Sequence, residues 1–85
     1  MNWIKVEDGM PENGQICLVT MKYINYPELE YKYCVQKFKY DIEKGWLYED
    51  WDDGYFVGWH TIDNIYDDED KVIAWRPYPE PYKGG

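Results

Sequence analysis

The chain has 85 residues and a formal net charge of −8, with 17 acidic residues against 9 basic ones. So large an acidic excess opposes binding to nucleic-acid phosphates and to anionic membranes, because both require a basic face. We therefore expect protein partners with a basic surface, no direct nucleic-acid binding and no membrane association. A chain of this length makes one domain, assigned to residues 1–81, with residues 82–85 as a flexible tail. The sequence leaves the oligomeric state open.

Aromatic residues supply much of the apolar material, with ten Tyr, five Trp and two Phe against a single alanine, Ala74. Tyrosine and tryptophan can bury a large ring and leave a polar tip in water, which suits a core too small to hide every side chain. β-branched and aromatic residues also favour strands over helices. The composition predicts a mainly β fold: a small antiparallel sheet or partly open barrel of about four to six short strands, with little or no helix.

The first part of the chain alternates strand-like and turn-like segments. Residues 2–6 alternate apolar and polar side chains as a short strand does, and residues 7–14 contain the proline and glycines of a turn. Residues 15–22 are nearly all apolar, which predicts a central strand buried on both faces. Cys17 and Cys34 fit no CxxC spacing, and we expect both to be reduced and buried.

Residues 31–40 contain a shift in the alternation of apolar side chains. The apolar residues before position 36 share one face of a regular strand, whereas Phe38 and Tyr40 fall on the other face. One extra residue at Gln36 and Lys37 would bring all of them to the same side. The pattern therefore predicts a β-bulge or a sharp bend at these two residues.

Hairpin and loop signals follow this strand. Residues 41–45 predict a turn that returns the chain into residues 46–48 as the next strand. Residues 49–54 are interpreted as an acidic loop, and residues 55–62 as an aromatic strand with a kink at Gly58.

The last third combines an acidic segment with one more strand. Residues 63–70 carry mostly like charges and are interpreted as a solvated loop. The apolar run at residues 72–76 predicts a strand. It must end near Arg76, because the prolines that follow fix φ and lack a backbone donor, and the chain continues as a polyproline-like tail.

Two short motifs bracket the chain. The first is Trp3-Ile4-x-Val6-x-Asp8-x-x-Pro11-x-x-Gly14 followed by Leu18-Val19, and the second is Trp75-x-Pro77-x-Pro79. They resemble the two ends of a phage and prophage small-protein family called domain of unknown function 551. That family usually ends Val-Thr-His-Trp-Met-Pro-Leu-Pro, and here Ile73, Ala74, Arg76 and Tyr78 replace the Thr, His, Met and Leu. The resemblance implies a source in a bacteriophage or integrated element and a place in the bacterial cytoplasm. It brings no catalytic activity with it.

The bracketing motifs also have a structural interpretation. We expect the terminal strands to pair, with the indoles of Trp3 and Trp75 in one core. Arg76 is expected to meet a carboxylate near Asp50 or Asp67. The residues assigned a structural role are Trp3, Pro11, Gly14, Trp75, Arg76, Pro77 and Pro79.

The sequence offers little catalytic or metal-binding chemistry. His60 is the only histidine, the chain has no serine, and no motif surrounds any other nucleophile, so we expect a partly buried histidine among aromatic residues and no enzyme activity. The acidic run that starts at Asp50 superficially resembles a calcium loop, but Gly54 is at the fifth position and Thr61 at the twelfth. We expect neither a metal nor a cofactor.

Acidic and aromatic residues together favour protein binding, because carboxylates can imitate phosphates while rings supply anchors. Our leading hypothesis is a non-catalytic phage or prophage accessory protein, acting as an acidic inhibitor of a host factor in defence or nucleic-acid handling. The alternatives are a module that binds a small ligand, carbohydrate or nucleotide through exposed Tyr and Trp, and a structural accessory domain. The predicted binding residues are Glu49, Asp50, Trp51, Asp52, Asp53, Tyr55, Asp67, Asp68, Glu69 and Asp70.

Overall fold

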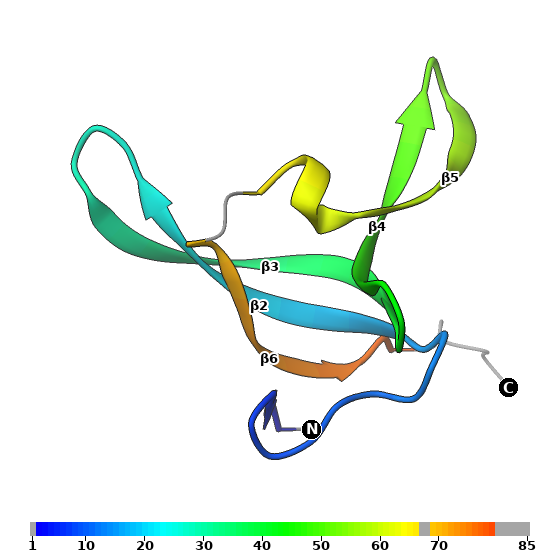
Figure 1. The fold of residues 1–85 in the computed structure, drawn as a ribbon, viewed down its shortest axis with the longest axis horizontal. Helices are drawn as coiled ribbons and strands as arrows, with labels where there is room; N and C mark the ends of the chain where they lie inside the picture. The colour runs from blue at the N-terminus through cyan, green and yellow to red at the C-terminus, as the bar shows by residue number, and fades with distance from the viewer. Residues whose placement is uncertain (1, 67–68, 80–85) are drawn as a thin grey trace, which may run out of the picture.

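Six strands form one antiparallel sheet in the computed structural model, which describes residues 2–66 and 69–79 (Figure 1). The strands are β1 (Ile4–Lys5), β2 (Ile16–Asn25), β3 (Glu30–Asp41), β4 (Gly45–Asp52), β5 (Tyr55–Thr61) and β6 (Lys71–Pro77), and the short 3₁₀ helix η1 (Ile62–Asn64) precedes β6. Their order across the sheet is β1-β6-β2-β3-β4-β5. The expected mainly β fold is confirmed. The expected tail at 82–85 lies outside the described residues.

The central strand is β2, which lies between β6 and β3. Cys17, Val19 and Met21 alternate along it and are fully buried. We call the sheet face that carries these three side chains the inner face, and the opposite one the outer face. The residues of β2 on the outer face, such as Leu18 and Thr20, are only partly buried. The expectation of burial on both faces was therefore wrong, because the side chains that pack over β2 do so on its inner face.

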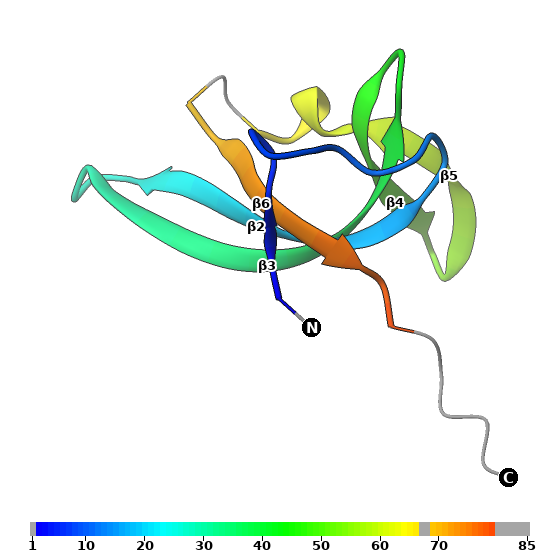
Figure 2. The same ribbon diagram turned by 90° about the horizontal axis from the view of Figure 1, so that it is seen from below.

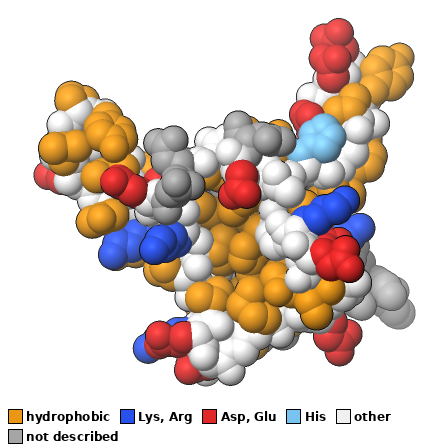
Figure 3. Space-filling model, in the orientation of Figure 1, with side chains coloured by type: hydrophobic (Ala, Val, Ile, Leu, Met, Phe, Trp, Pro, Cys, Tyr) orange, Lys and Arg blue, Asp and Glu red, His pale blue; other side chains and the backbone are white. Residues whose placement is uncertain are grey.

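The core on the inner face is closed by side chains from other strands and from the segments that cross over the sheet. Phe38 and Trp75 complete the buried cluster, and Val6, Ile62 and Tyr66 pack against it. Figure 2 shows η1 and the segment between β1 and β2 on the same side of the sheet. In Figure 3 hydrophobic side chains gather over the middle of the sheet, with carboxylates mostly at the periphery. The region predicted as a solvated loop, residues 63–70, thus contains a residue that packs against the core, Tyr66.

The two ends of the chain meet, as expected. β1 pairs with β6, with Ile4 opposite Trp75. Trp75 is 7% exposed, and its Nε1–H donates to the Gly9 carbonyl at 2.9 Å. Trp3 is 39% exposed instead. The expectation that both indoles share one core was wrong, because Ile4 takes the position opposite Trp75 and alternation sends Trp3 to the outer face.

Arg76 also lies on the outer face, where it contacts an aromatic ring. Its guanidinium carbon is 5.7 Å from the centroid of the Trp3 ring, a cation–π distance. The expected contact with Asp50 was wrong, because Asp50 pairs with His60 instead. Asp67 lies outside the described residues. Among those described, the buried Nε of Arg76 has no hydrogen-bond partner.

The predicted bulge in β3 was wrong. The β2–β3 ladder runs without a register shift, with Val19 opposite Gln36 and Leu18 opposite Lys37. Register shifts occur instead in β6, where Ile73 is the extra residue, and in β5. The prediction assumed that all the apolar residues of this segment share one core. Those at the start of β3 remain exposed on the outer face: Tyr31, Tyr33 and Val35.

Two residues of the first motif have clear roles in the segment between β1 and β2. Gly14 has φ +82°, a left-handed conformation that favours glycine, and its N–H donates to the Tyr40 carbonyl at 2.6 Å. Pro11 is buried. The Gly14 hydrogen bond therefore joins this segment to the end of β3. In the second motif, Pro77 is the last residue of β6, and Pro79 is exposed.

Candidate functional site

The β4–β5 hairpin projects from the body of the sheet (Figure 1). β4 pairs with β3 only as far as Tyr48, opposite Phe38, and beyond that point it pairs with β5 alone. Trp51, Tyr55 and Phe56 lie on this projecting part, and each is about half exposed or more. The hairpin therefore presents three rings to solvent at a distance from the core.

A tight turn closes the hairpin. Asp53 has φ +49° and Gly54 has φ +83°, the pair of positive values that a two-residue type I′ turn requires. β4 continues to Asp52. The expectation of an acidic loop over residues 49–54 was therefore wrong. The carboxylates of this region lie on a strand and a defined turn, which fixes their positions relative to the rings.

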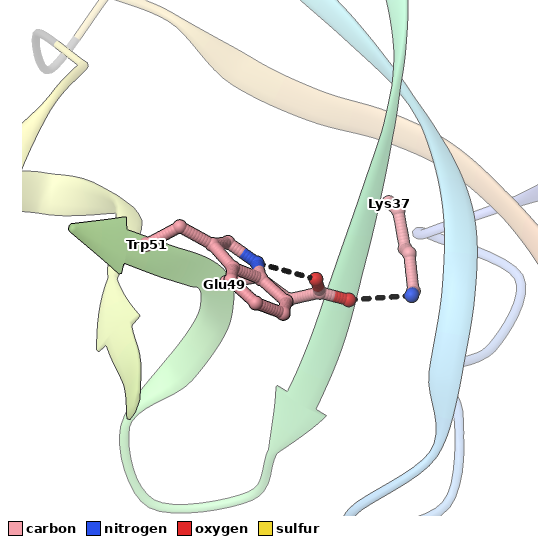
Figure 4. Close-up of polar contacts among 3 residues, drawn as sticks. All are labelled: Lys37, Glu49 and Trp51. Carbon is pink, nitrogen blue, oxygen red and sulfur yellow. Dashed lines mark hydrogen bonds and ion pairs between the residues drawn. The ribbon is translucent and has the colours of Figure 1, made fainter. Parts of the chain in front are cut away.

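Glu49 connects the hairpin to the body of the sheet (Figure 4). One carboxylate oxygen forms an ion pair with Nζ of Lys37 on β3, and the other accepts a hydrogen bond from Nε1–H of Trp51 at 3.0 Å. The contacts with Lys37 and then Trp51 lower the pKa of Glu49, and the hydrogen bond with Glu49 raises the pKa of Lys37. Glu49 thus orients the Trp51 indole and ties β4 to β3 just beyond their last ladder pair.

Asp50 and His60 form a second polar pair across the hairpin. The Oδ2 of Asp50 is 2.9 Å from Nδ1 of His60, and both side chains are partly exposed. The imidazole also packs edge-on against Tyr48, with ring centroids 6.1 Å apart. The expectation of a partly buried histidine among aromatic residues is confirmed.

The two acidic segments do not form one site. Asp52, Asp53 and Tyr55 lie at the hairpin tip, whereas Glu69 and Asp70 precede β6 at the far end of the sheet (Figures 1 and 2). Asp70 has a structural role, since its Oδ1 accepts a hydrogen bond from the Ile24 N–H at 3.2 Å. Asp67 and Asp68 lie outside the described residues. Only the predicted residues from 49 to 55 are brought together.

Two aromatic residues of the hairpin, Phe56 and Trp59, were not among the predicted binding residues. The ring of Phe56 lies 5.4 Å from that of Trp51 and 6.1 Å from that of Trp59. These three rings line an open hollow of about 380 Å³ together with Lys37 and Glu49. Alternation alone would not have found this group, because it puts Phe56 and Trp59 on opposite faces of β5, and only the register shift at Val57 brings them to the same side.

The fold defines the class of the protein, a small β protein built on a single antiparallel sheet. The chain belongs to the family described as "Protein of unknown function (DUF551)", whose model matches residues 2–83, so the resemblance of its terminal motifs is confirmed. Comparison with curated proteins and with solved structures gave no match.

The remaining reactive groups are the two thiols. Cys17 and Cys34 are both free, but only Cys17 is buried, so the expectation of burial was wrong for Cys34, whose strand position leaves it partly exposed. Burial raises the pKa of the Cys17 thiol to about 11. Residues 2–66 and 69–79 contain no group of three His, Cys, Asp or Glu side chains placed to hold a metal ion. The same residues form no helix with the length and apolar character needed to cross a membrane.

Proposed function

We propose that the protein acts without catalysis, by binding another protein through its β4–β5 hairpin. The observation that carries this proposal is the projecting hairpin, on which exposed Trp51, Tyr55 and Phe56 stand beside carboxylates. Aromatic side chains are the preferred anchors of protein interfaces, and charges at the rim steer association and select the partner.

The hairpin is preorganised for such a role. Glu49 fixes the Trp51 indole, and the turn at Asp53 and Gly54 holds the tip in one conformation. Binding by a preordered segment loses less conformational entropy than binding by a flexible loop. Asp52 and Asp53 at the tip favour a partner whose docking surface is basic.

The partner class follows from charge and family. A net charge of −8 and an acidic docking element fit a target that itself handles nucleic acid, since such proteins carry basic surfaces. The resemblance of the terminal motifs implies a phage or prophage source, which fits an accessory protein that inhibits a host factor in the bacterial cytoplasm.

A carbohydrate or other small ligand is less well supported. The hollow lined by Trp51, Phe56 and Trp59 offers stacking surfaces, as carbohydrate sites do. Its carboxylate, however, belongs to Glu49, and both oxygens of Glu49 are already bonded to Lys37 and Trp51. A sugar bound there would lack a free charged acceptor.

The test is capture of the partner from a bacterial host lysate by immobilised protein, across a salt gradient and after nuclease treatment. Asp52→Asn with Asp53→Asn removes two charges from the hairpin tip while keeping side chains that tolerate the turn geometry. Glu12→Gln with Glu43→Gln removes the same charge from exposed sites elsewhere.

We expect the parent protein and the Glu12/Glu43 variant to capture the same basic protein, identified by mass spectrometry, and its recovery to fall as salt rises. The Asp52/Asp53 variant should lose it. Equal capture by both double variants, or capture that is insensitive to salt, would overturn the proposal.

A further inference from the structure

The basic residues are concentrated on the outer face of the sheet, although the protein as a whole is acidic. Strand register places six of the nine on that face: Lys5, Lys22, Lys37, Lys39, Lys71 and Arg76. Among the strand residues that the register assigns to this face, only Asp41 and Glu49 are acidic. Glu49 is paired with Lys37, and the Asp41 carboxylate accepts two backbone N–H groups in the β3–β4 turn. The free charge of the outer face is therefore positive.

Aromatic rings alternate with these cations. Every cation–π contact among the described residues lies on the outer face, at centroid distances of 4.3 Å for Lys22 and Tyr31, 4.9 Å for Lys37 and Tyr78, 5.4 Å for Lys39 and Trp59, and 5.7 Å for Arg76 and Trp3. Tyr31, Tyr33 and Tyr78 remain about half exposed. The face thus offers flat rings and positive charges side by side.

Two cations on this face occupy opposed positions in the sheet. Lys22 and Lys71 are directly opposite each other on β2 and β6. Like charges in opposed positions destabilise a sheet, whereas an anion bound between them would remove the repulsion. These opposed lysines are therefore better suited to binding a negatively charged ligand than to stabilising the sheet.

A hollow at the β1 edge extends the same face. It measures about 480 Å³ and is lined by Trp3, Lys5, Val6, Glu7, Ile73 and Ala74. This volume lies within the range of about 300–1,000 Å³ found for small-molecule sites. An indole on which a base could stack is therefore present in this hollow, with the Lys5 ammonium group and the Glu7 carboxylate beside it.

We propose that the outer face binds single-stranded nucleic acid. Proteins that bind single strands combine a positively charged track for the backbone with aromatic rings on which bases stack, and this face carries both. A duplex would satisfy the charges but not the rings, because its bases are stacked on each other. An acidic peptide would likewise leave the rings without flat partners. This inference goes beyond the proposed function and does not depend on it.

Net charge does not rule out such binding. The expectation of no nucleic-acid binding assumed that the net charge of −8 is spread evenly over the surface. The strand register instead places basic residues on the outer face, whereas many acidic residues lie in turns. At physiological salt the Debye length is about 8 Å, so distant carboxylates act only weakly on a ligand bound to the outer face.

The test uses fluorescence anisotropy with a labelled oligothymidylate of 15 nucleotides, titrated with the full protein between 50 and 200 mM salt. Lys22→Gln with Lys71→Gln removes two charges from the outer face. Lys32→Gln with Lys44→Gln is the matched control, because Lys32 belongs to the inner face and Lys44 to a turn. Both double variants change the net charge by the same amount.

Each phosphate contact contributes about 0.7 to the steepness with which log K falls against log salt, so loss of two contacts in the Lys22/Lys71 variant should lower the steepness by about 1.4. At 0.1 M salt this corresponds to about 25-fold weaker binding. The melting temperature of this variant should change little, because removal of the like-charge pair offsets the lost contact between Lys22 and Tyr31. The Lys32/Lys44 variant should bind much as the parent does. Equal losses in the two double variants, or no binding at 50 mM salt and 100 µM protein, would overturn the proposal.

Two further arms identify the ligand class and separate this proposal from the hairpin. Tyr31→Leu with Tyr33→Leu should weaken binding without changing the salt slope, because it removes stacking and no charge. Asp52→Asn with Asp53→Asn should bind the oligonucleotide at least as well as the parent. Binding of polyglutamate or of a DNA duplex as tightly as the single strand would overturn the assignment to single strands.

Discussion

Truncation of Trp75 is the sharpest test of how the chain ends close the fold. Trp75 is 7% exposed, lies opposite both Ile4 and Val19, and donates a hydrogen bond to Gly9. Trp75→Ala should cost about 3–5 kcal/mol through lost burial and the cavity left behind. Trp3→Ala should cost only about 1–2 kcal/mol, from partial burial and one cation–π contact. A domain of this length is stabilised by about 4–13 kcal/mol in total.

The assay is urea unfolding followed by far-ultraviolet circular dichroism, which does not depend on the tryptophan that is removed. If Trp75→Ala fails to fold, the comparison moves to Trp75→Phe and Trp3→Phe. Trp75→Phe keeps most of the ring burial and loses the hydrogen bond to Gly9, about 1 kcal/mol, whereas Trp3→Phe should be nearly neutral. Equal costs at the two positions, within about 0.5 kcal/mol for the Ala pair or for the Phe pair, would refute the assignment of Trp75 to the core and Trp3 to the outer face.

The other predictions concern the hairpin and the thiols. The lowered pKa of Glu49 means that its contribution to stability is present above its usual value of 4.5 and is lost as the pH falls through the folded value. Urea midpoints of the parent and of Glu49→Gln, which breaks the pair with Lys37, should therefore differ at pH 7 and converge in acid; a constant difference would contradict this. Cys34 should react with a disulfide reagent in the folded protein and Cys17 only after unfolding, and equal rates would count against the burial of Cys17. Gly54→Ala should cost about 1–2 kcal/mol in urea unfolding because φ is +83°, and an unchanged midpoint would argue against the type I′ turn.

Local patterns predicted most of the sheet. The apolar run at residues 15–22 and the turn at residues 41–45 gave β2 and the β3–β4 hairpin, because side-chain alternation and turn chemistry are encoded over a few residues. The predicted bulge failed for a tertiary reason. It required every apolar residue to be buried, but with the outer face uncovered by the described chain Tyr31 stays at the surface, where Lys22 lies over its ring.

The functional surfaces were harder to predict than the strands. The Asp53-Gly54 pair is a strong hairpin signal, but the surrounding carboxylates were given more weight and the segment was interpreted as a loop. The basic outer face depends on register between strands that are distant in sequence, as the opposition of Lys22 and Lys71 shows. No local sequence pattern indicates such pairing, so the net charge alone could not show that the basic residues gather on one face of the sheet.

Lys37 is the residue that the two proposed surfaces share. Its ammonium group lies on the outer face over the Tyr78 ring, and it also holds the Glu49 carboxylate that orients Trp51 on the hairpin. A phosphate that approached Lys37 would compete with Glu49 for the same charge. Our two proposals together predict that occupation of the outer face and the orientation of the Trp51 anchor are coupled through this ion pair. Nucleic acid bound on the outer face would then loosen the hairpin that we propose docks a protein.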